Sequence, residues 1–462
     1  MTHRRAWTDY HPAYRAEQMR ELASWIAAGQ SGSVVGMGGA GKSNLLGFLV
    51  HRPEVLSGYL PEGARAMAVL VDLNSLPALD LATLYRLLLR GFRSAAAGLE
   101  PELAAEIERV FAAQLAERDP FVVQTALLAW LARLTDDGRR VGLVFDRFDR
   151  FAERATPEIS DSLRALRDAF KGRLGFIVGM RQPCAYLPDP GVLGELQELL
   201  DTHTCWVGPM VPSDARRMLD EELLGADPAP TPSEAAALLD ATGGYPALLK
   251  SACAWWRQEA NRPPRDAWPQ LLGQLPAMRV RLDEVWEGLT QAEQAALTAV
   301  ATGTGSPVAR RAAELEHGPA FELLEAKGLL VDEPDSGWRV QGRLLALRAG
   351  GQTRRRGRLW LDDVTGEVHL GATPLRELTR LERGALLYLL ARSRVRVGKT
   401  ELIEGVWPDD VVEDGIMDDA LYQVVRGLRR KIEPDPGRPR YLVTWRGRPE
   451  GGYQLFPEGR PS

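Results

Sequence analysis

Short, continuously apolar runs alternate with stretches of helical periodicity along the first half of the chain. Runs of strand length occupy residues 33–35, 66–72, 141–146, 174–181 and 202–207. An apolar run without alternation is typical of a strand that is covered on both faces. Strands that alternate with helices predict a parallel, three-layer α/β domain, whose site lies at the carboxyl ends of the strands.

From Ser213 onward the pattern becomes helical, and it changes character again near residue 349. Residues 282–347 read as three helices and a small hairpin, which is the pattern of a winged helix; residues 349–357 form a basic, Gly-containing linker. A second set of three helices and hairpins follows the linker. We therefore predict an α/β domain over 1–210, a helical lid over 211–275, a first winged helix over 276–348, the linker over 349–357 and a second winged helix over 358–462.

The first apolar run leads into the sequence Gly36-x-x-x-x-Gly41-Lys42-Ser43, and a helical apolar pattern starts at Leu45. Strand, glycine loop and helix in this order are the context of a phosphate-binding P-loop. Glycines let backbone N–H groups curl around a polyphosphate, and the helix directs its positive end at the same anion. The residues predicted to bind ATP or ADP are Gly36, Gly38, Gly39, Ala40, Gly41, Lys42, Ser43 and Asn44.

A second apolar strand ends in Asp146, as the Mg²⁺-side carboxylate of a P-loop ATPase requires. We expect this strand to lie beside the P-loop strand, so that Asp146 and the Ser43 hydroxyl share Mg²⁺. Many related ATPases place an acid directly after this Asp, but Arg147 stands there. Either Asp149 orients the attacking water or hydrolysis is slow, so enzymatic turnover stays open. The strand 174–180 ends at Arg181, which is placed to contact the γ-phosphate.

Composition limits the class of protein. With 462 residues, 45% hydrophobic and 26% charged, the chain should form several globular domains. Its three cysteines have no metal-binding spacing and suit a reducing compartment. The first residues lack the apolar core of a signal peptide, and no run is long enough for a membrane span. We expect a cytoplasmic protein that does not enter membranes.

The net charge of −5 does not indicate nucleic-acid binding, but it hides a local partition. Charged residues between Glu401 and Asp419 are all acidic, whereas basic residues dominate between Leu421 and Arg448. In the helix predicted over 418–432, apolar residues at 4-3-4 spacing must face the core. The outward strip and the hairpin then supply candidate DNA-binding residues. These residues are Tyr422, Gln423, Arg426, Arg429, Arg430, Arg446 and Arg448.

Residues 14–347 resemble the STAND class of signalling P-loop ATPases, which is related to AAA+ proteins. The resemblance rests on Gly36–Ser43, Asp146, Arg181 and the motif Gly244-Tyr245-Pro246, followed by a winged helix. It implies that Pro246 contacts the adenine side of the nucleotide and that Arg181 is a sensor. It also implies that ADP holds the modules closed, and that ATP opens them for self-association into a homo-oligomer. Gln341 stands where relatives often carry a nucleotide-sensing His, and no repeat array follows.

Residues 358–456 resemble the OmpR-type winged-helix DNA-binding family. The matching motifs are Leu378-Thr-x-x-Glu382, Val406-Trp407, Val425-Arg-x-Leu-Arg-x-Lys-Ile432 and Thr444-x-Arg446-Gly447. The resemblance implies that the helix 418–432 enters the major groove of double-stranded DNA. It also implies that the loop 407–415 contacts RNA polymerase.

We therefore predict an ATP-dependent switch with a C-terminal DNA-binding domain, most simply a transcriptional regulator. One alternative is a DNA-stimulated ATPase of the replication-initiator or antiviral-defence type. Another is a nucleotide-gated scaffold whose winged helices bind protein.

Overall fold

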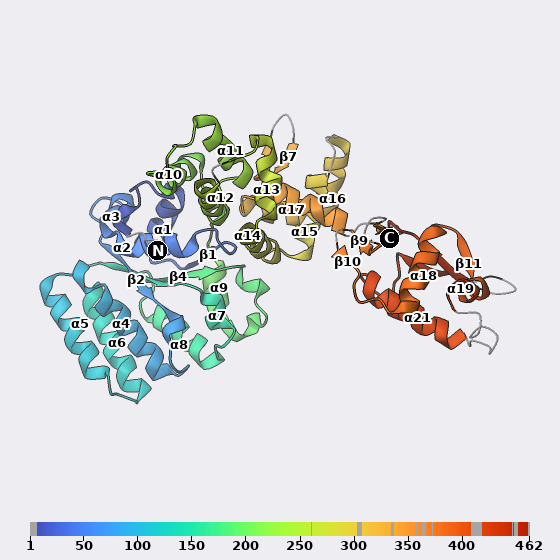
Figure 1. Cartoon of the computed structure of the whole chain (residues 1–462). Helices are drawn as coiled ribbons and strands as arrows, with labels where there is room; N and C mark the ends of the chain where they lie inside the picture. Colours follow the sequence, from blue (N-terminus) through green and yellow to red (C-terminus); the bar gives the residue numbers. More distant parts are fainter. Residues whose placement is uncertain are drawn as a thin grey trace. The chain divides into compact units, whose positions relative to one another are not determined.

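The computed structural model describes residues 7–259, 261–302, 307–333, 337–355, 358–362, 366–371, 373–407, 418–445, 447 and 451–460. The chain forms two compact units, Met1–Leu347 and Arg348–Ser462 (Figure 1). The boundary between them falls within helix α17 (Arg343–Arg355), so the expected linker is helical as far as Arg355.

The first unit contains a five-stranded parallel sheet in the order β2-β3-β4-β1-β5. Its strands are β1 (Gly32–Val35), β2 (Ala66–Val71), β3 (Arg140–Phe145), β4 (Leu174–Met180) and β5 (Thr204–Trp206). The expectation that the Asp146 strand lies beside the P-loop strand is wrong, because β4 pairs with both β1 and β3 and separates them. The chain returns from β3 through two helices, α7 (Phe148–Ala152) and α8 (Pro157–Ala169), into β4 in the middle of the sheet. When parallel strands are joined by crossovers of this kind, their order along the chain does not determine their order in the sheet.

Helices cover both faces of this sheet. They are α1 (Ala16–Ala28), α2 (Lys42–His51), α3 (Pro53–Tyr59), α4 (Leu81–Ser94), α5 (Pro101–Gln114), α6 (Pro120–Thr135), α7 (Phe148–Ala152), α8 (Pro157–Ala169) and α9 (Glu195–Asp201). Helix α4 packs on β2 and also against α5 and α6. Helix α3 begins at Pro53, a residue well suited to the first turn of a helix.

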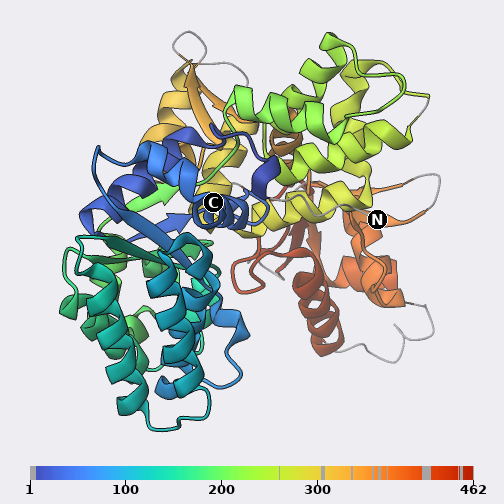
Figure 2. The same ribbon diagram turned by 90° about the vertical axis from the view of Figure 1, so that its left-hand side faces the viewer.

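The rest of the first unit is mainly helical. Its elements are α10 (Pro212–Glu222), α11 (Pro232–Thr242), α12 (Pro246–Gln258), α13 (Trp268–Gln274), α14 (Pro276–Glu287), α15 (Gln291–Thr302), α16 (Pro307–Ala326), β6 (Leu330–Glu333) and β7 (Gly337–Val340). Figures 1 and 2 show α10 to α12 (green) and the α5–α6 pair (teal) at opposite ends of the unit. A buried ion pair joins Lys327 Nζ to Glu293 Oε1 at 2.5 Å, and so ties the residue after α16 to α15.

The second unit has two small antiparallel sheets and three described helices. The elements are β8 (Leu359–Leu361), β9 (Val368–Leu370), β10 (Thr373–Pro374), α18 (Arg380–Ala391), β11 (Arg396–Gly398), α19 (Lys399–Val406), α21 (Asp418–Ile432), β12 (Leu442–Trp445) and β13 (Gly452–Leu455). Helix α18 begins with a capping box, in which Thr379 and Glu382 bond each other's backbone N–H groups. The predicted core face of α21 is also confirmed: Leu421, Val425, Leu428 and Ile432 are buried.

Candidate nucleotide and nucleic-acid sites

The P-loop follows β1 and opens α2, as the sequence predicted. Gly39 and Gly41 have φ angles of 79° and 96°, a region that side-chain-bearing residues rarely adopt. A methyl group at Gly36 would lie 2.2 Å from the carbonyl oxygen of Val207, so only glycine fits beside the end of β5. Glycine is thus required at three positions of this loop for backbone reasons.

Backbone N–H groups of the loop provide the means of binding an anion. Within the described part of the chain, the amides of Gly38, Gly39, Gly41, Lys42 and Ser43 meet no protein acceptor. Amides that converge on one side of a glycine loop, at the start of a helix, form an anion-binding nest. Ser43 and Asn44 are exposed on the first turn of α2.

Lys42 folds back over its own loop. Its ammonium group donates to the carbonyl oxygens of Gly36 and Met37, the second at 3.3 Å. Burial lowers the pKa of Lys42 to about 8; the negative charges of Asp149 and Asp146 act against this shift, and the positive charge of Arg181 adds to it. The structure therefore brings together the four charged residues that the sequence proposed for catalysis.

Asp146 follows β3, and β4 separates β3 from β1, the strand that precedes the P-loop. A methyl group at Gly179 of β4 would lie 3.1 Å from Asp146 Oδ1 and 2.7 Å from Cδ1 of Leu46 in α2. The missing side chain at Gly179 thus leaves room for the Asp146 carboxylate beside β4. Ser43 and Asp146 offer the hard oxygen ligands that Mg²⁺ prefers, and bound phosphates would complete its coordination. Among the described residues, no group of three or more His, Cys, Asp or Glu side chains could hold a metal by itself.

Asp149 and Arg181 form a loose ion pair at the same edge of the sheet. Asp149 Oδ2 lies 3.8 Å from Arg181 Nε, and the Arg181 side chain is 64% exposed. Arg147, which follows Asp146 directly, adopts a left-handed backbone conformation with φ 57° and donates its N–H to Asp146 Oδ1 at 3.0 Å. The exposed Arg147 side chain lies beside Asp146, with Nε 4.0 Å from Oδ2, so a cation stands where related ATPases place a second acid.

The helical segment after the sheet contacts the P-loop directly. A methyl group at Gly41 would lie 3.7 Å from Cγ of Pro246, the residue predicted to contact the nucleotide. Sequence reasoning missed two neighbours, Tyr245 and Arg15, which bond to loop carbonyls. Tyr245 sits within the Gly-Tyr-Pro motif, so its position offered a signal. Arg15 offered none beyond its place next to an amphipathic helix.

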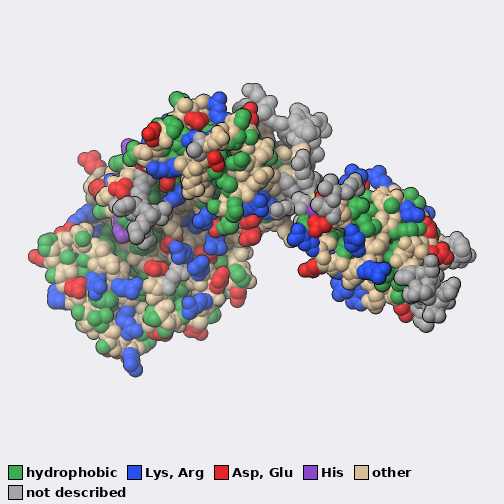
Figure 3. All heavy atoms as spheres, in the orientation of Figure 1, with side chains coloured by type: hydrophobic (Ala, Val, Ile, Leu, Met, Phe, Trp, Pro, Cys, Tyr) green, Lys and Arg blue, Asp and Glu red, His purple; other side chains and the backbone are tan. Residues whose placement is uncertain are grey.

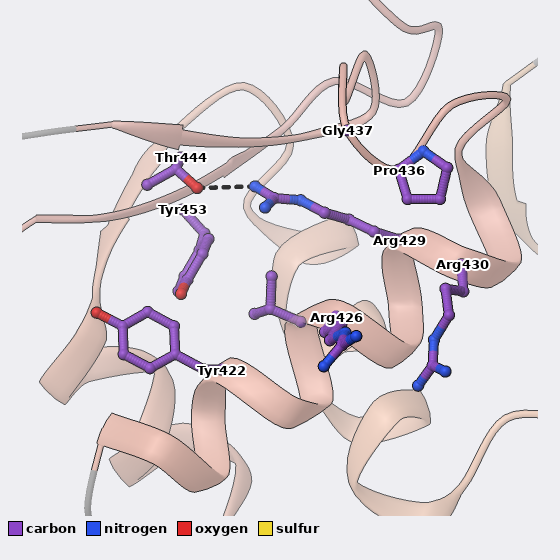
Figure 4. Close-up of a pocket in the computed structure, with 9 residues that line it drawn as sticks. Tyr422, Arg426, Arg429, Arg430, Pro436, Gly437, Thr444 and Tyr453 are labelled. Carbon is purple, nitrogen blue, oxygen red and sulfur yellow. Dashed lines mark hydrogen bonds between the residues drawn. The ribbon is translucent and has the colours of Figure 1, made fainter.

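In the second unit, α21 exposes the predicted strip. Tyr422, Gln423, Arg426 and Arg430 are exposed, whereas Arg429 is half-buried. Arg429 donates from Nε to the carbonyl oxygen of Leu442 at 3.0 Å and from Nη2 to Thr444 Oγ1 at 2.7 Å. Figure 4 shows Arg429 reaching toward Thr444 while Arg430 points away from the hairpin. The remaining candidates, Arg446 and Arg448, lie outside the described residues.

Two grooves flank the junction of α21 and the hairpin. The first, of ≈ 590 Å³, is lined by Tyr422, Arg426, Arg429, Arg430 and Thr444 among others. The second, of ≈ 610 Å³, shares Arg429 and Thr444 and adds Arg438, Arg440 and Arg460, which sequence reasoning missed. Figure 3 shows basic side chains spread over the face of this unit that the view presents.

These elements define two classes of domain in one chain. The first unit has a P-loop ATPase fold, with a five-stranded parallel sheet and a glycine loop that opens α2. The second unit carries a winged-helix domain of the OmpR type. The predicted fold class, the P-loop ATPase fold and the resemblance to the OmpR-type family are confirmed; the narrower assignment to the STAND class stays a prediction.

The comparisons with known proteins give the same division. Residues 374–455 match the family model described as "Transcriptional regulatory protein, C terminal". Protein PetR of Rhodobacter capsulatus is 39% identical over 115 residues, which are 24% of this chain and 47% of that protein. The chain therefore spans about half the length of this curated relative.

Two solved structures are similar to the larger part of the chain. One is the ORC2 protein of Aeropyrum pernix in ADPNP–ADP complexes, at 16% identity and a TM-score of 0.40, covering 75% of this chain and 96% of that one. The other is a Walker-type ATPase of Pyrococcus abyssi, at 15% identity and a TM-score of 0.41, covering 72% and 95%. Likenesses at this level carry no conclusion about function. In the described ranges, no helix combines the length and apolar character of a membrane span.

Proposed function

We propose that this protein is a cytoplasmic, ATP-dependent transcriptional regulator of the STAND type. The observation that carries the proposal is the match of residues 374–455 to a DNA-binding family, on a unit whose helix α21 exposes Arg426 and Arg430. Arg and Gln side chains on an exposed recognition helix bond base edges and phosphates in the major groove of double-stranded DNA. The P-loop supplies the second half of the proposal, a switch that responds to the nucleotide.

The charged residues of the first unit have separate roles in this switch. Lys42 and the loop amides bind the phosphates, Ser43 and Asp146 hold Mg²⁺, and Pro246 contacts the adenine side. Asp149 lies 3.8 Å from Arg181, so a γ-phosphate competes with Asp149 for the guanidinium group. Arg181 then senses ATP, and hydrolysis is slow because Arg147 replaces the usual second acid.

DNA binding would depend on self-association. A lone winged helix contacts few phosphates, so joining several copies raises affinity through multivalency. We infer that the ATP state forms the homo-oligomer and that the ADP state does not. Contact of the loop 407–415 with RNA polymerase falls almost wholly outside the described residues and stays a prediction.

The test is DNA binding by the full chain at matched salt with ATP, with ADP and without nucleotide. Fluorescence anisotropy on a duplex chosen by genome-wide mapping of bound sites should show tighter binding with ATP. Lys42→Ala should lose the nucleotide effect and keep basal binding. Equal affinity with ATP and ADP across a salt titration would refute the switch. ATP turnover stimulated by any DNA would point to the initiator or defence class, and unchanged binding after Arg426→Ala and Arg430→Ala would favour the scaffold.

A further inference from the structure

Three consecutive carbonyl groups of the P-loop accept hydrogen bonds from outside the loop. The Gly38 oxygen accepts from the Tyr245 hydroxyl at 2.7 Å, and the Gly39 oxygen accepts from the Ala247 N–H at 3.2 Å. The Ala40 oxygen accepts from Arg15 Nη2 at 2.7 Å. We call Tyr245, Ala247 and Arg15 the carbonyl clamp.

All three clamp residues are connected to the helices that follow the sheet. Tyr245 is the N-cap of α12, and Ala247 is in its first turn. Arg15 is buried and donates its backbone N–H to Asp214 Oδ2 in α10 at 2.9 Å, while its Nη2 also bonds the Gly208 oxygen at 2.9 Å. Packing at this contact is close, since a methyl group at Gly39 would lie 2.6 Å from Cβ of Ala247.

The clamp determines which way the loop amides point. In a trans peptide the carbonyl oxygen and the following N–H lie on opposite sides of the bond. Holding the oxygens of Gly38 and Ala40 toward Tyr245 and Arg15 therefore directs the N–H groups of Gly39 and Gly41 to the other side of the loop. These two amides are among those that meet no protein acceptor in the described ranges.

We propose that Tyr245, Ala247 and Arg15 position the phosphate-binding loop from outside it. The carbonyl clamp holds the loop in its anion-binding shape, so phosphate affinity depends on these three contacts, and their loss speeds the release of nucleotide. Tyr245 and Arg15 are positioning residues in this scheme, because they act on the loop and not on the ligand. The inference rests on nucleotide binding at the P-loop.

Tyr245 is the clamp residue that can be altered most cleanly. Its side chain is buried, and burial raises the pKa of Tyr245, which keeps the hydroxyl a donor. Tyr245→Phe removes that donor and leaves the ring in place, so the Gly38 carbonyl loses its partner. Tyr85→Phe is the matched control, because Tyr85 is also buried in this unit and its hydroxyl bonds Ser162, whose helix α8 is outside the clamp.

The experiment measures ADP affinity and the ADP release rate with a fluorescent ADP analogue on the full chain, together with thermal unfolding. Loss of one hydrogen bond to the half-buried Gly38 carbonyl should weaken ADP binding roughly three- to tenfold in Tyr245→Phe and speed release correspondingly. Tyr85→Phe should bind ADP like the wild type. Equal affinity of Tyr245→Phe and wild type, or equal losses in both variants, would overturn the clamp. A wild-type protein that binds no nucleotide would instead refute the proposed function.

Discussion

The salt dependence of DNA binding tests the second unit most directly, because it counts phosphate contacts. We consider the double variant Arg426→Ala/Arg430→Ala in the full chain, bound to a random-sequence duplex. Both arginines are exposed on α21, and neither makes a hydrogen bond or ion pair among the described residues. Their removal should therefore change charge contacts with DNA and leave the stability of the fold unchanged.

The magnitude follows from counterion release. Each phosphate neutralised by a protein cation contributes about −0.9 to the slope of log K against log salt. If both arginines meet phosphates in non-specific binding, the slope should become less steep by about 1.8. Fluorescence anisotropy at several salt concentrations measures the slope, and Arg392→Ala serves as the control. Arg392 directly follows α18, and its guanidinium group lies over the Tyr388 ring. It does not line either groove.

Arg429 gives the contrasting result. Its two hydrogen bonds to β12 fix the hairpin to α21, so Arg429→Ala should lower the free energy of unfolding by about 1–2 kcal/mol. We expect Arg429→Ala to reduce DNA affinity because the hairpin shifts, while the slope of log K against log salt changes little. An unchanged slope in the double variant, with a large change in Arg429→Ala alone, would refute this assignment of roles.

Three further predictions concern packing and pH. Gly39→Ala places a side chain 2.6 Å from Ala247 Cβ at a φ of 79°, so calorimetry should show ADP affinity at least about tenfold weaker; wild-type affinity would contradict the close approach. Lys327→Met leaves the Glu293 carboxylate buried without its cation and should lower the free energy of unfolding in urea by about 3–5 kcal/mol. A decrease under about 1 kcal/mol would argue against an ion pair shielded from water. Burial alone would raise the pKa of Glu382, but hydrogen bonds from Lys431 and Thr379 outweigh it and lower the pKa. The ionised form of Glu382 therefore stabilises the fold at neutral pH, and this contribution is lost in acid. The difference in unfolding midpoint between wild type and Glu382→Gln should shrink as pH falls from 7 to about 3.5. A difference that stays constant would contradict this.

The fold was accessible from sequence wherever a local pattern determines it. The apolar runs located all five strands of the parallel sheet, and 4-3-4 spacing identified the buried face of α21. Strand order was not accessible, because β4 enters between β1 and β3 through packing of distant segments.

The site was predictable to the extent that its residues lie in one motif. Lys42 and Asp146 could be named from local context, but Gly179 could not, since its role is to leave space for a side chain from another strand. Arg429 is a basic residue on a basic helix, so the sequence predicted that it contacts DNA. In the structure it bonds Leu442 and Thr444 of the hairpin instead. Which arginine of a basic helix is committed to the fold depends on such tertiary contacts, which composition does not encode.

The clamp and the few free arginines of α21 together limit how a nucleotide can act on DNA binding. A ligand shifts an equilibrium only by its difference in affinity between two states. In this protein the described contacts that would distinguish those states, at Gly38, Gly39 and Ala40, all lie in the first unit. Under the proposed switch, nucleotide would therefore change self-association of the first unit and leave the DNA-binding face of each copy unaltered. ATP should then steepen the dependence of binding on protein concentration, while the salt slope per bound copy stays the same.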